Sequence, residues 1–266
     1  MGFSDKLEAA IKKNNSLLCV GLDADINKLP QEFQGKSDGQ FEFNKMIIDA
    51  THDLVCAYKP NSAFYEADGT AGIDNLKLTF EYIRMTYPDI VTILDSKRGD
   101  IGNTNDGYCT FAFDYLGADS ITLHPYMGRE SLQPLLDKKD KGCIVLCRTS
   151  NHGAGELQDL KIDGKELYKI VAEKVAKEWN INRNCLLVVG ATVPEELAQV
   201  RAIVGDDMTF LVPGIGAQGG DVEKTVKAGK NSKGTGMIIN SARSIIFATD
   251  PRAEAQKLRD EINSFR

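Results

Sequence analysis

The sequence predicts an α/β protein, a single-domain (β/α)8 TIM barrel, and two observations carry this prediction. Short, continuous apolar runs recur along the 266 residues, as in parallel strands that are covered on both faces. Segments with helical periodicity, in which apolar residues fall on one face, separate these runs. Eight runs are expected to be strands: 17–22, 54–60, 90–94, 120–124, 143–147, 185–190, 209–214 and 236–240.

Helices are also expected at both ends of the chain. Residues 1–15 are amphipathic and predict a helix before the first strand, and residues 252–266 predict the last helix. A doubly wound sheet is the alternative fold, but it would normally carry a GxGxxG turn after strand one, where this chain has GLDAD at 21–25. No linker or shift in composition divides the sequence, so residues 1–266 are expected to form one domain.

Composition and charge restrict the classes of function. The formal net charge of -6 and the pI of about 5.2 argue against a nucleic acid or an anionic membrane as partner, because both require a basic face. No run approaches the roughly 20 apolar residues that cross a bilayer, and the first residues do not resemble a secretory signal. The six cysteines are scattered without a CxxC pair, so we expect reduced thiols, no metal site and a cytoplasmic protein.

Charged side chains follow the predicted strands at the carboxyl ends, where these barrels place their reactive groups. The densest cluster is ILDSKRGDIGNT (93–104), which contains Asp95, Lys97 and Asp100. An extended strand end would point Asp95 and Lys97 the same way, and Lys59 closes the neighbouring strand. A lysine held among carboxylates keeps its proton, which suits a general acid and disfavours imine chemistry. The alternative is a salt-bridge network that only pins the strand ends.

A second motif predicts a phosphate site after strands seven and eight, the usual position in these barrels. The glycines of VPGIGAQGGD (212–221), Gly220 among them, allow backbone N–H groups to approach an anion. Arg243 in NSARSI (240–245) would complete the phosphate-binding site, and Gln218 could donate a hydrogen bond through its side-chain amide. A tight turn and a solvated helix start are the alternatives for the glycines and the arginine.

Eight motifs, taken in order along nearly the whole chain, belong together: VGLDAD, YKPNSAFYE, LDSKRGDIGNT, ITLHPYMG, CRTSNHGAG, VVGATVPEE, VPGIGAQGGD and NSARSI. They resemble the orotidine 5'-phosphate decarboxylase family, specifically its longer, type 2 subfamily. His152 departs from the pattern, which would have a proline there. The resemblance implies decarboxylation of orotidine 5'-monophosphate to UMP and CO2, the final step of de novo UMP synthesis, with no metal and no organic cofactor.

The resemblance also implies a role for each site residue. Lys59, Asp95, Lys97 and Asp100 would form the catalytic network, with Lys97 as proton donor. Asp100 and Thr104 would enter the site of the opposite subunit of a homodimer. The other residues would bind the substrate: Asp23 and Asn61 at the ribose or the charged network, Thr149 and Ser150 at the pyrimidine ring, Thr192 near the ribose or phosphate, and Gln218, Gly220 and Arg243 at the phosphate.

Three other functions fit parts of the pattern. A sugar-phosphate decarboxylase or isomerase of the same barrel superfamily would usually hold Mg²⁺ on carboxylates, and its activity would depend on metal. A class I aldolase would form a lysine imine, which borohydride would trap with substrate. A non-catalytic barrel would bind phosphate compounds such as UMP and turn nothing over.

Overall fold

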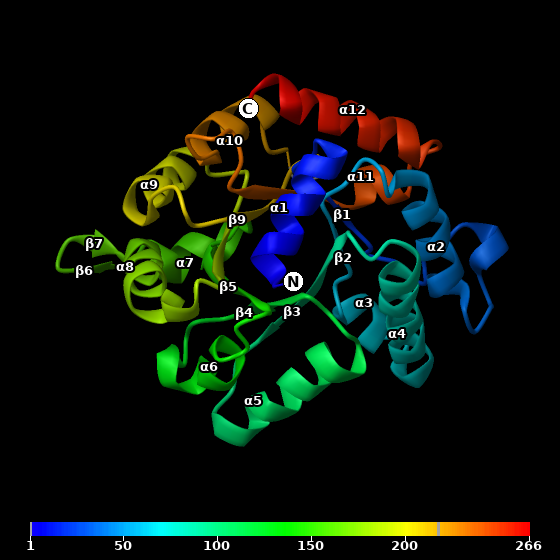
Figure 1. Cartoon of the computed structure of the whole chain (residues 1–266), viewed down its shortest axis with the longest axis horizontal. Helices are drawn as coiled ribbons and strands as arrows, with labels where there is room; N and C mark the ends of the chain where they lie inside the picture. Colours follow the sequence, from blue (N-terminus) through cyan, green and yellow to red (C-terminus); the bar gives the residue numbers. More distant parts are fainter. Residues whose placement is uncertain (1, 217–218) are drawn as a thin grey trace.

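The computed structural model describes residues 2–216 and 219–266 and shows a closed barrel of parallel strands surrounded by helices (Figure 1). Around the barrel the strand order is β1-β10-β9-β8-β5-β4-β3-β2. All eight predicted runs form barrel strands, so the predicted fold class is confirmed. The strands are β1 (Leu18–Gly21), β2 (Ala57–Lys59), β3 (Val91–Arg98), β4 (Ser120–Leu123), β5 (Gly142–Arg148), β8 (Cys185–Val189), β9 (Phe210–Pro213) and β10 (Met237–Ser241).

Helices alternate with these strands and cover the outside of the barrel (Figure 1). The two terminal helices occur where the sequence predicts them, and Asp250 caps the last one by accepting a hydrogen bond from the Ala253 N–H at 2.9 Å. The α-helices are α1 (Phe3–Asn14), α2 (Gly39–Thr51), α3 (Ala63–Glu66), α4 (Gly69–Thr86), α5 (Gly102–Cys109), α6 (Gly128–Leu136), α7 (Gly155–Gln158), α8 (Leu167–Lys174), α9 (Pro194–Val204), α10 (Val222–Gly229), α11 (Arg243–Ile246) and α12 (Pro251–Ser264).

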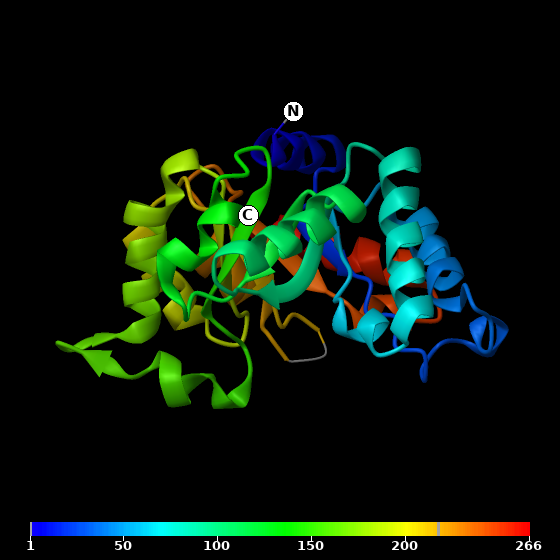
Figure 2. The same cartoon turned by 90° about the horizontal axis from the view of Figure 1, so that it is seen from below.

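The first helix closes one end of the barrel. Helix α1 buries Phe3 and Leu7 beneath it, and the Phe3 N–H donates to the Asp140 carbonyl just before β5 at 3.0 Å. Lys6 pairs with Asp119, just before β4, at 2.7 Å. The loops that follow β5 and β9 lie at the opposite end (Figure 2). The carboxyl ends of the strands are therefore free of α1 and can carry a site.

The core is built from the barrel strands and the inner faces of the helices. Every residue of β1, β4 and β8 is buried, as expected for strands covered on both faces. The six cysteines are all buried, and none forms a disulfide bond. Across residues 2–216 and 219–266, no helix combines the length and the apolar character that a membrane crossing requires.

Two features of the backbone differ from the sequence-based expectation. Strands β6 (Lys161–Ile162) and β7 (Lys165–Glu166) form a small hairpin outside the barrel, which was not predicted. Its turn is the pair Asp163-Gly164, both at positive φ, and an Asp-Gly pair is a recognisable hairpin signal. Strand β3 continues to Arg98 instead of ending at residue 94, because its pairing with β4 resumes after an irregularity. That irregularity lies inside the predicted site.

Candidate active site

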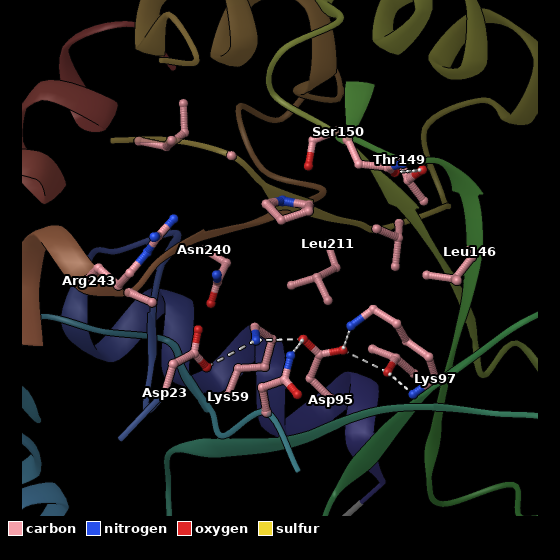
Figure 3. A pocket seen from close by; sticks show the side chains of 18 of the residues that line it. Asp23, Lys59, Asp95, Lys97, Leu146, Thr149, Ser150, Leu211, Asn240 and Arg243 are labelled. Carbon is pink, nitrogen blue, oxygen red and sulfur yellow. Dashed lines mark hydrogen bonds and ion pairs between the residues drawn. The ribbon is translucent and has the colours of Figure 1, made fainter. Parts of the chain in front are cut away.

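A pocket of about 470 Å³ opens at the carboxyl ends of the barrel strands (Figure 3). Its wall is formed by residues from β1, β2, β3, β4, β5, β8, β9 and β10 or from the loops directly after them. Eight of the predicted site residues lie in this wall: Asp23, Lys59, Asn61, Asp95, Lys97, Thr149, Ser150 and Arg243. The topology therefore brings together side chains that are up to 220 positions apart, from Asp23 to Arg243.

The carboxylate of Asp95 is the centre of the charged cluster. It accepts hydrogen bonds from Lys59 Nζ at 2.7 Å and from Lys97 Nζ at 2.6 Å. Thr122 Oγ1 donates to it at 2.9 Å and Asn61 Nδ2 at 3.4 Å. Burial by itself would raise the pKa of Asp95, but the charges of Lys59 and Lys97 outweigh burial and hold the pKa well below its usual range. Asp95 is therefore ionised at neutral pH.

Lys59 is the buried cation of the cluster. Its side chain is 5% exposed and lies between Asp95 and Asp23, whose Oδ1 is 3.9 Å from Nζ. Burial would lower the pKa of Lys59, but the two carboxylates outweigh burial and raise the pKa. Burial raises the pKa of Asp23, and Lys59 opposes that shift. Charges of alternating sign thus run from Asp23 through Lys59 and Asp95 to Lys97 (Figure 3).

Lys97 is the accessible cation of the cluster. Its side chain is 48% exposed, so its ammonium can meet a ligand in the pocket. The expectation that Asp95 and Lys97 share the direction of an extended strand is wrong in its geometry, because Lys97 has a φ of 49° in the left-handed region. The two side chains nevertheless meet, through a bulged backbone.

Asp100 and Thr104 do not lie in the pocket of their own chain. The Asp100 carboxylate accepts a hydrogen bond from the Ile101 N–H at 2.7 Å, and Thr104 is exposed near the start of α5. Within the described residues of one chain, Asp100 makes no ion pair with Lys97. One chain therefore assembles the predicted network without Asp100. In the segment between Lys97 and Asp100, the Gly99 carbonyl oxygen lies 2.8 Å from His124 Nε2.

Arg243, the first residue of α11, lines the pocket at the end away from Lys97 (Figure 3). Among the described residues its guanidinium has no hydrogen-bond or ion-pair partner. The loop after β9 approaches this side through Gly214. Gly220 lies against Ala191, where an added Cβ would be 2.7 Å from the alanine Cβ, so only glycine fits. This arrangement leaves a cation and a tight glycine loop facing the same space.

Besides Asp100 and Thr104, three predicted residues are outside the pocket wall or outside the described part of the chain. Gly220 supports the loop without lining the pocket. Thr192 donates through Oγ1 to the Ser150 carbonyl at 3.3 Å and so holds the loop after β5. Gln218 lies outside the described residues.

Sequence reasoning missed several pocket residues. The side chain of Gln158 makes two hydrogen bonds with Thr149: it accepts from the Thr149 N–H and donates to the Thr149 hydroxyl, both at 2.9 Å. Thr122 lies within a strand and not at its end. Apolar residues of the pocket wall cannot be distinguished from core residues in the sequence, because both kinds occur inside apolar runs. The unassigned wall residues are Thr122, Leu146, Asn151, Gln158, Val188, Leu211, Pro213, Ile215, Asn240 and Ala242, whereas Gly214 belongs to the predicted glycine loop. Of these, only Asn151 and Asn240 carried a signal in the sequence, as polar residues at strand ends.

The pocket can bind a ligand that has two anionic or polar ends and an apolar middle. The lysines and carboxylates form a row along one side, Arg243 lies at the end away from Lys97, and the apolar side chains of Leu146 and Leu211 line the same pocket (Figure 3). A preorganised cation beside a reacting atom stabilises negative charge that develops there. Lys97 also lines the pocket, and a lysine in such a position can act as a general acid.

Comparison with known proteins identifies the relatives of this chain. The model of the Orotidine 5'-phosphate decarboxylase / HUMPS family matches residues 16–258. The orotidine 5'-phosphate decarboxylases of Cellvibrio japonicus (strain Ueda107) and Janthinobacterium sp. (strain Marseille) are each 50% identical to it, over 100% of this chain and 100% and 99% of theirs. The solved structure of Leishmania donovani OMP decarboxylase is 43% identical, with a TM-score of 0.89 over 100% of this chain and 98% of that chain.

Proposed function

The chain belongs to the Orotidine 5'-phosphate decarboxylase / HUMPS family, and on this premise we propose that it decarboxylates orotidine 5'-monophosphate to UMP and CO2. We propose that it does so in the cytoplasm without a metal or an organic cofactor, as the final step of de novo UMP synthesis. The observation that carries the proposal is the row Asp23, Lys59, Asp95 and Lys97 in the pocket of a chain whose relatives bear this name over their full length.

Lys97 is the proton donor in this proposal. When the bond between the pyrimidine C6 and the carboxylate breaks, CO2 leaves and the electron pair stays on C6. The ammonium of Lys97 stabilises that charge and then transfers a proton to C6, which gives UMP and a neutral amine that solvent reprotonates. The exposure of Lys97 and its 2.6 Å pair with Asp95 support this role, because the partner holds the proton donor in place.

Asp95 and Lys59 act on the same carbon indirectly. The Asp95 carboxylate would lie beside the departing carboxylate, and its repulsion decreases as charge moves from that group into the ring. Lys59 compensates the buried negative charge and holds Asp95 in one orientation. The depressed pKa of Asp95 supports this role, since the group is ionised at neutral pH.

The remaining residues bind the substrate. Arg243 and Gln218 would bind the phosphate, with the backbone near Gly220. Asp23 and Asn61 would contact the ribose. Thr149 and Ser150 would face the pyrimidine ring, and Thr192 would lie near the ribose or phosphate. The unpaired state of Arg243 among the described residues supports its assignment, because a free guanidinium in a pocket is ready to bind an anion.

Asp100 and Thr104 act in the pocket of a second subunit. Their positions outside their own pocket support this arrangement, as do two exposed apolar side chains in the loops after β3 and β4. Ile101 is 56% exposed and Tyr126, in the loop after β4, is 87% exposed. A homodimer that covers these side chains would carry each Asp100 toward the partner's Lys97, and symmetry would make both sites alike.

The aldolase alternative has less support. A lysine that forms an imine must be a neutral amine, whereas the carboxylates around Lys59 raise its pKa.

An experiment distinguishes the proposed activity from the Mg²⁺-dependent alternative. Purified protein should convert orotidine 5'-monophosphate to UMP in a spectrophotometric assay, and EDTA should leave the rate unchanged. A chain that binds UMP but leaves the substrate intact, or whose rate disappears with EDTA, would contradict the proposal.

A further inference from the structure

The backbone between Asp95 and Lys97 is held by one residue of the neighbouring strand. Strands β3 and β4 pair at Leu94 with Ile121 and again at Arg98 with Leu123. Between these pairs, three residues of β3 (95–97) stand opposite the single residue Thr122. Bulges of this kind redirect side chains and are frequent beside active sites.

The hydroxyl of Thr122 makes three hydrogen bonds at this bulge. Its Oγ1 accepts from the Ser96 N–H at 3.0 Å and from the Lys97 N–H at 2.9 Å. It donates to Asp95 Oδ1 at 2.9 Å, and the same Oδ1 accepts from Lys97 Nζ. Thr122 is 1% exposed, so water cannot readily replace these contacts. One oxygen thus touches the backbone of Lys97 and the carboxylate that holds its side chain.

These contacts explain an otherwise unfavourable conformation. Lys97 has a φ of 49°, which is uncommon for a residue other than glycine, asparagine or aspartate and costs free energy unless neighbouring groups hold it. Two successive N–H groups that point at one oxygen form a nest, and a nest requires such a backbone. A hydroxyl can fill this nest and still donate a proton to a carboxylate, whereas an aliphatic side chain can do neither.

We propose that Thr122 is a positioning residue for the reaction. Its hydroxyl holds the bulge that places the Lys97 ammonium against Asp95 and toward the reacting carbon, although Thr122 itself contacts no reacting atom. The inference rests on the proposed function for its kinetic consequence. Its structural consequence, the position of Lys97, is independent of what the pocket binds.

The test compares three variants with the wild-type protein. Thr122→Val keeps the β-branched shape and removes the hydroxyl, and Thr122→Ser keeps the hydroxyl. Thr92→Val is the matched control, because Thr92 is a buried threonine of β3 whose hydroxyl donates to Asp119 Oδ2, at the end of the barrel covered by α1. For Thr122→Val we expect kcat to fall by about 10- to 100-fold through misplacement of Lys97. The affinity for UMP should change by less than about threefold, since ground-state contacts persist.

The serine variant and the control separate positioning from packing. Thr122→Ser should recover most of the lost kcat, and Thr92→Val should keep the wild-type kcat even if its melting temperature falls. Equal losses in Thr122→Val and Thr122→Ser, or an unchanged kcat in a folded Thr122→Val, would overturn the proposal. A parallel loss of UMP affinity and kcat would also overturn it, because it would indicate a general distortion of the pocket.

Crystal structures of the variants test the effect of Thr122 on the position of Lys97 independently of activity. In Thr122→Val, or in Thr122→Ala if the valine variant does not fold, the Lys97 Nζ to Asp95 Oδ1 distance should exceed the 2.6 Å seen here, with loss of the positive φ at Lys97. An unchanged bulge would refute positioning by Thr122. A wild-type protein that is inactive toward orotidine 5'-monophosphate would refute the proposed function and leave this structural test decisive for Thr122.

Discussion

Positively charged side chains have different partners at the two ends of the barrel. At the amino end, Arg201 of α9 donates five hydrogen bonds to the backbone carbonyls of four residues, and its guanidinium lies 3.9 Å from the ring centroid of Phe210. At the carboxyl end, Lys59 and Lys97 are held by side-chain carboxylates, and Arg243 has no partner among the described residues.

This difference separates a cation that binds only backbone carbonyls from cations that line the pocket. The carbonyls around Arg201 are neutral and use all its donor directions, so it has little capacity left for a ligand. Burial lowers the pKa of Arg201 to about 10, which still leaves it charged at neutral pH. The cations at the carboxyl end keep donors that point into the pocket. Substitutions at the two ends should therefore change different measurements.

The largest effect is expected for Lys97→Ala. The substitution removes both the cation and the proton donor, so kcat should fall by more than about a hundredfold, the typical contribution of general acid catalysis. The melting temperature and the affinity for UMP should change far less. Lys6→Ala is the control at the other end, because Lys6 is a lysine in an ion pair of similar length, 2.7 Å to Asp119. A Lys97→Ala variant with more than a hundredth of the wild-type kcat would exclude Lys97 as the acid.

The next effect concerns Asp100 and the partner subunit. Lys97→Ala and Asp100→Ala homodimers should each be nearly inactive, and mixing them after dissociation should restore activity. In a mixed dimer with exchanged Asp100 residues, one site carries both lesions and the other carries none. Random reassortment of equal amounts makes half of the dimers mixed, so activity should reach about a quarter of wild type. Mixed dimers confirmed by mass but without activity would place Asp100 in its own subunit.

A smaller loss of activity is expected for Arg243→Ala. The variant loses a charge-assisted hydrogen bond, which should cost about 1.5 to 3 kcal/mol in kcat/KM for the nucleotide. The nucleoside without phosphate should be affected far less. Arg252→Ala is the control, because Arg252 pairs with Asp53 away from the pocket, at 2.7 Å. Equal losses for nucleotide and nucleoside would show that Arg243 does not bind the phosphate.

The smallest effect on activity is expected for Arg201→Met. The aliphatic side chain can still pack on Phe210 but leaves carbonyls without their charged donor, so stability should fall by about 1.5 to 3 kcal/mol. In a chain of this length the melting temperature falls by about 2 to 4 °C per kcal/mol. The kcat of the folded fraction should remain that of wild type. A loss of kcat without a loss of stability would contradict the expectation that Arg201 contributes to stability and not to activity.

Much of the site could be predicted because strand ends are visible in the sequence. Asp23, Lys59, Asp95 and Lys97 each follow or end an apolar run, and a parallel barrel brings all such ends to one face. The wall residues Leu146 and Leu211 could not be predicted, because an apolar side chain that lines a pocket has the same sequence pattern as one in the core.

The sequence by itself determined the closed barrel, its eight strands and the charged character of its carboxyl end, because the period of apolar residues and the chemistry of strand ends are local properties. The tertiary structure decided which charges meet and how. The bulge at residues 95–97 depends on Thr122, which is 25 positions after Lys97 and reaches it through the pairing of β3 with β4. A contact between distant residues is set by the packing of whole strands, so no local pattern could reveal it.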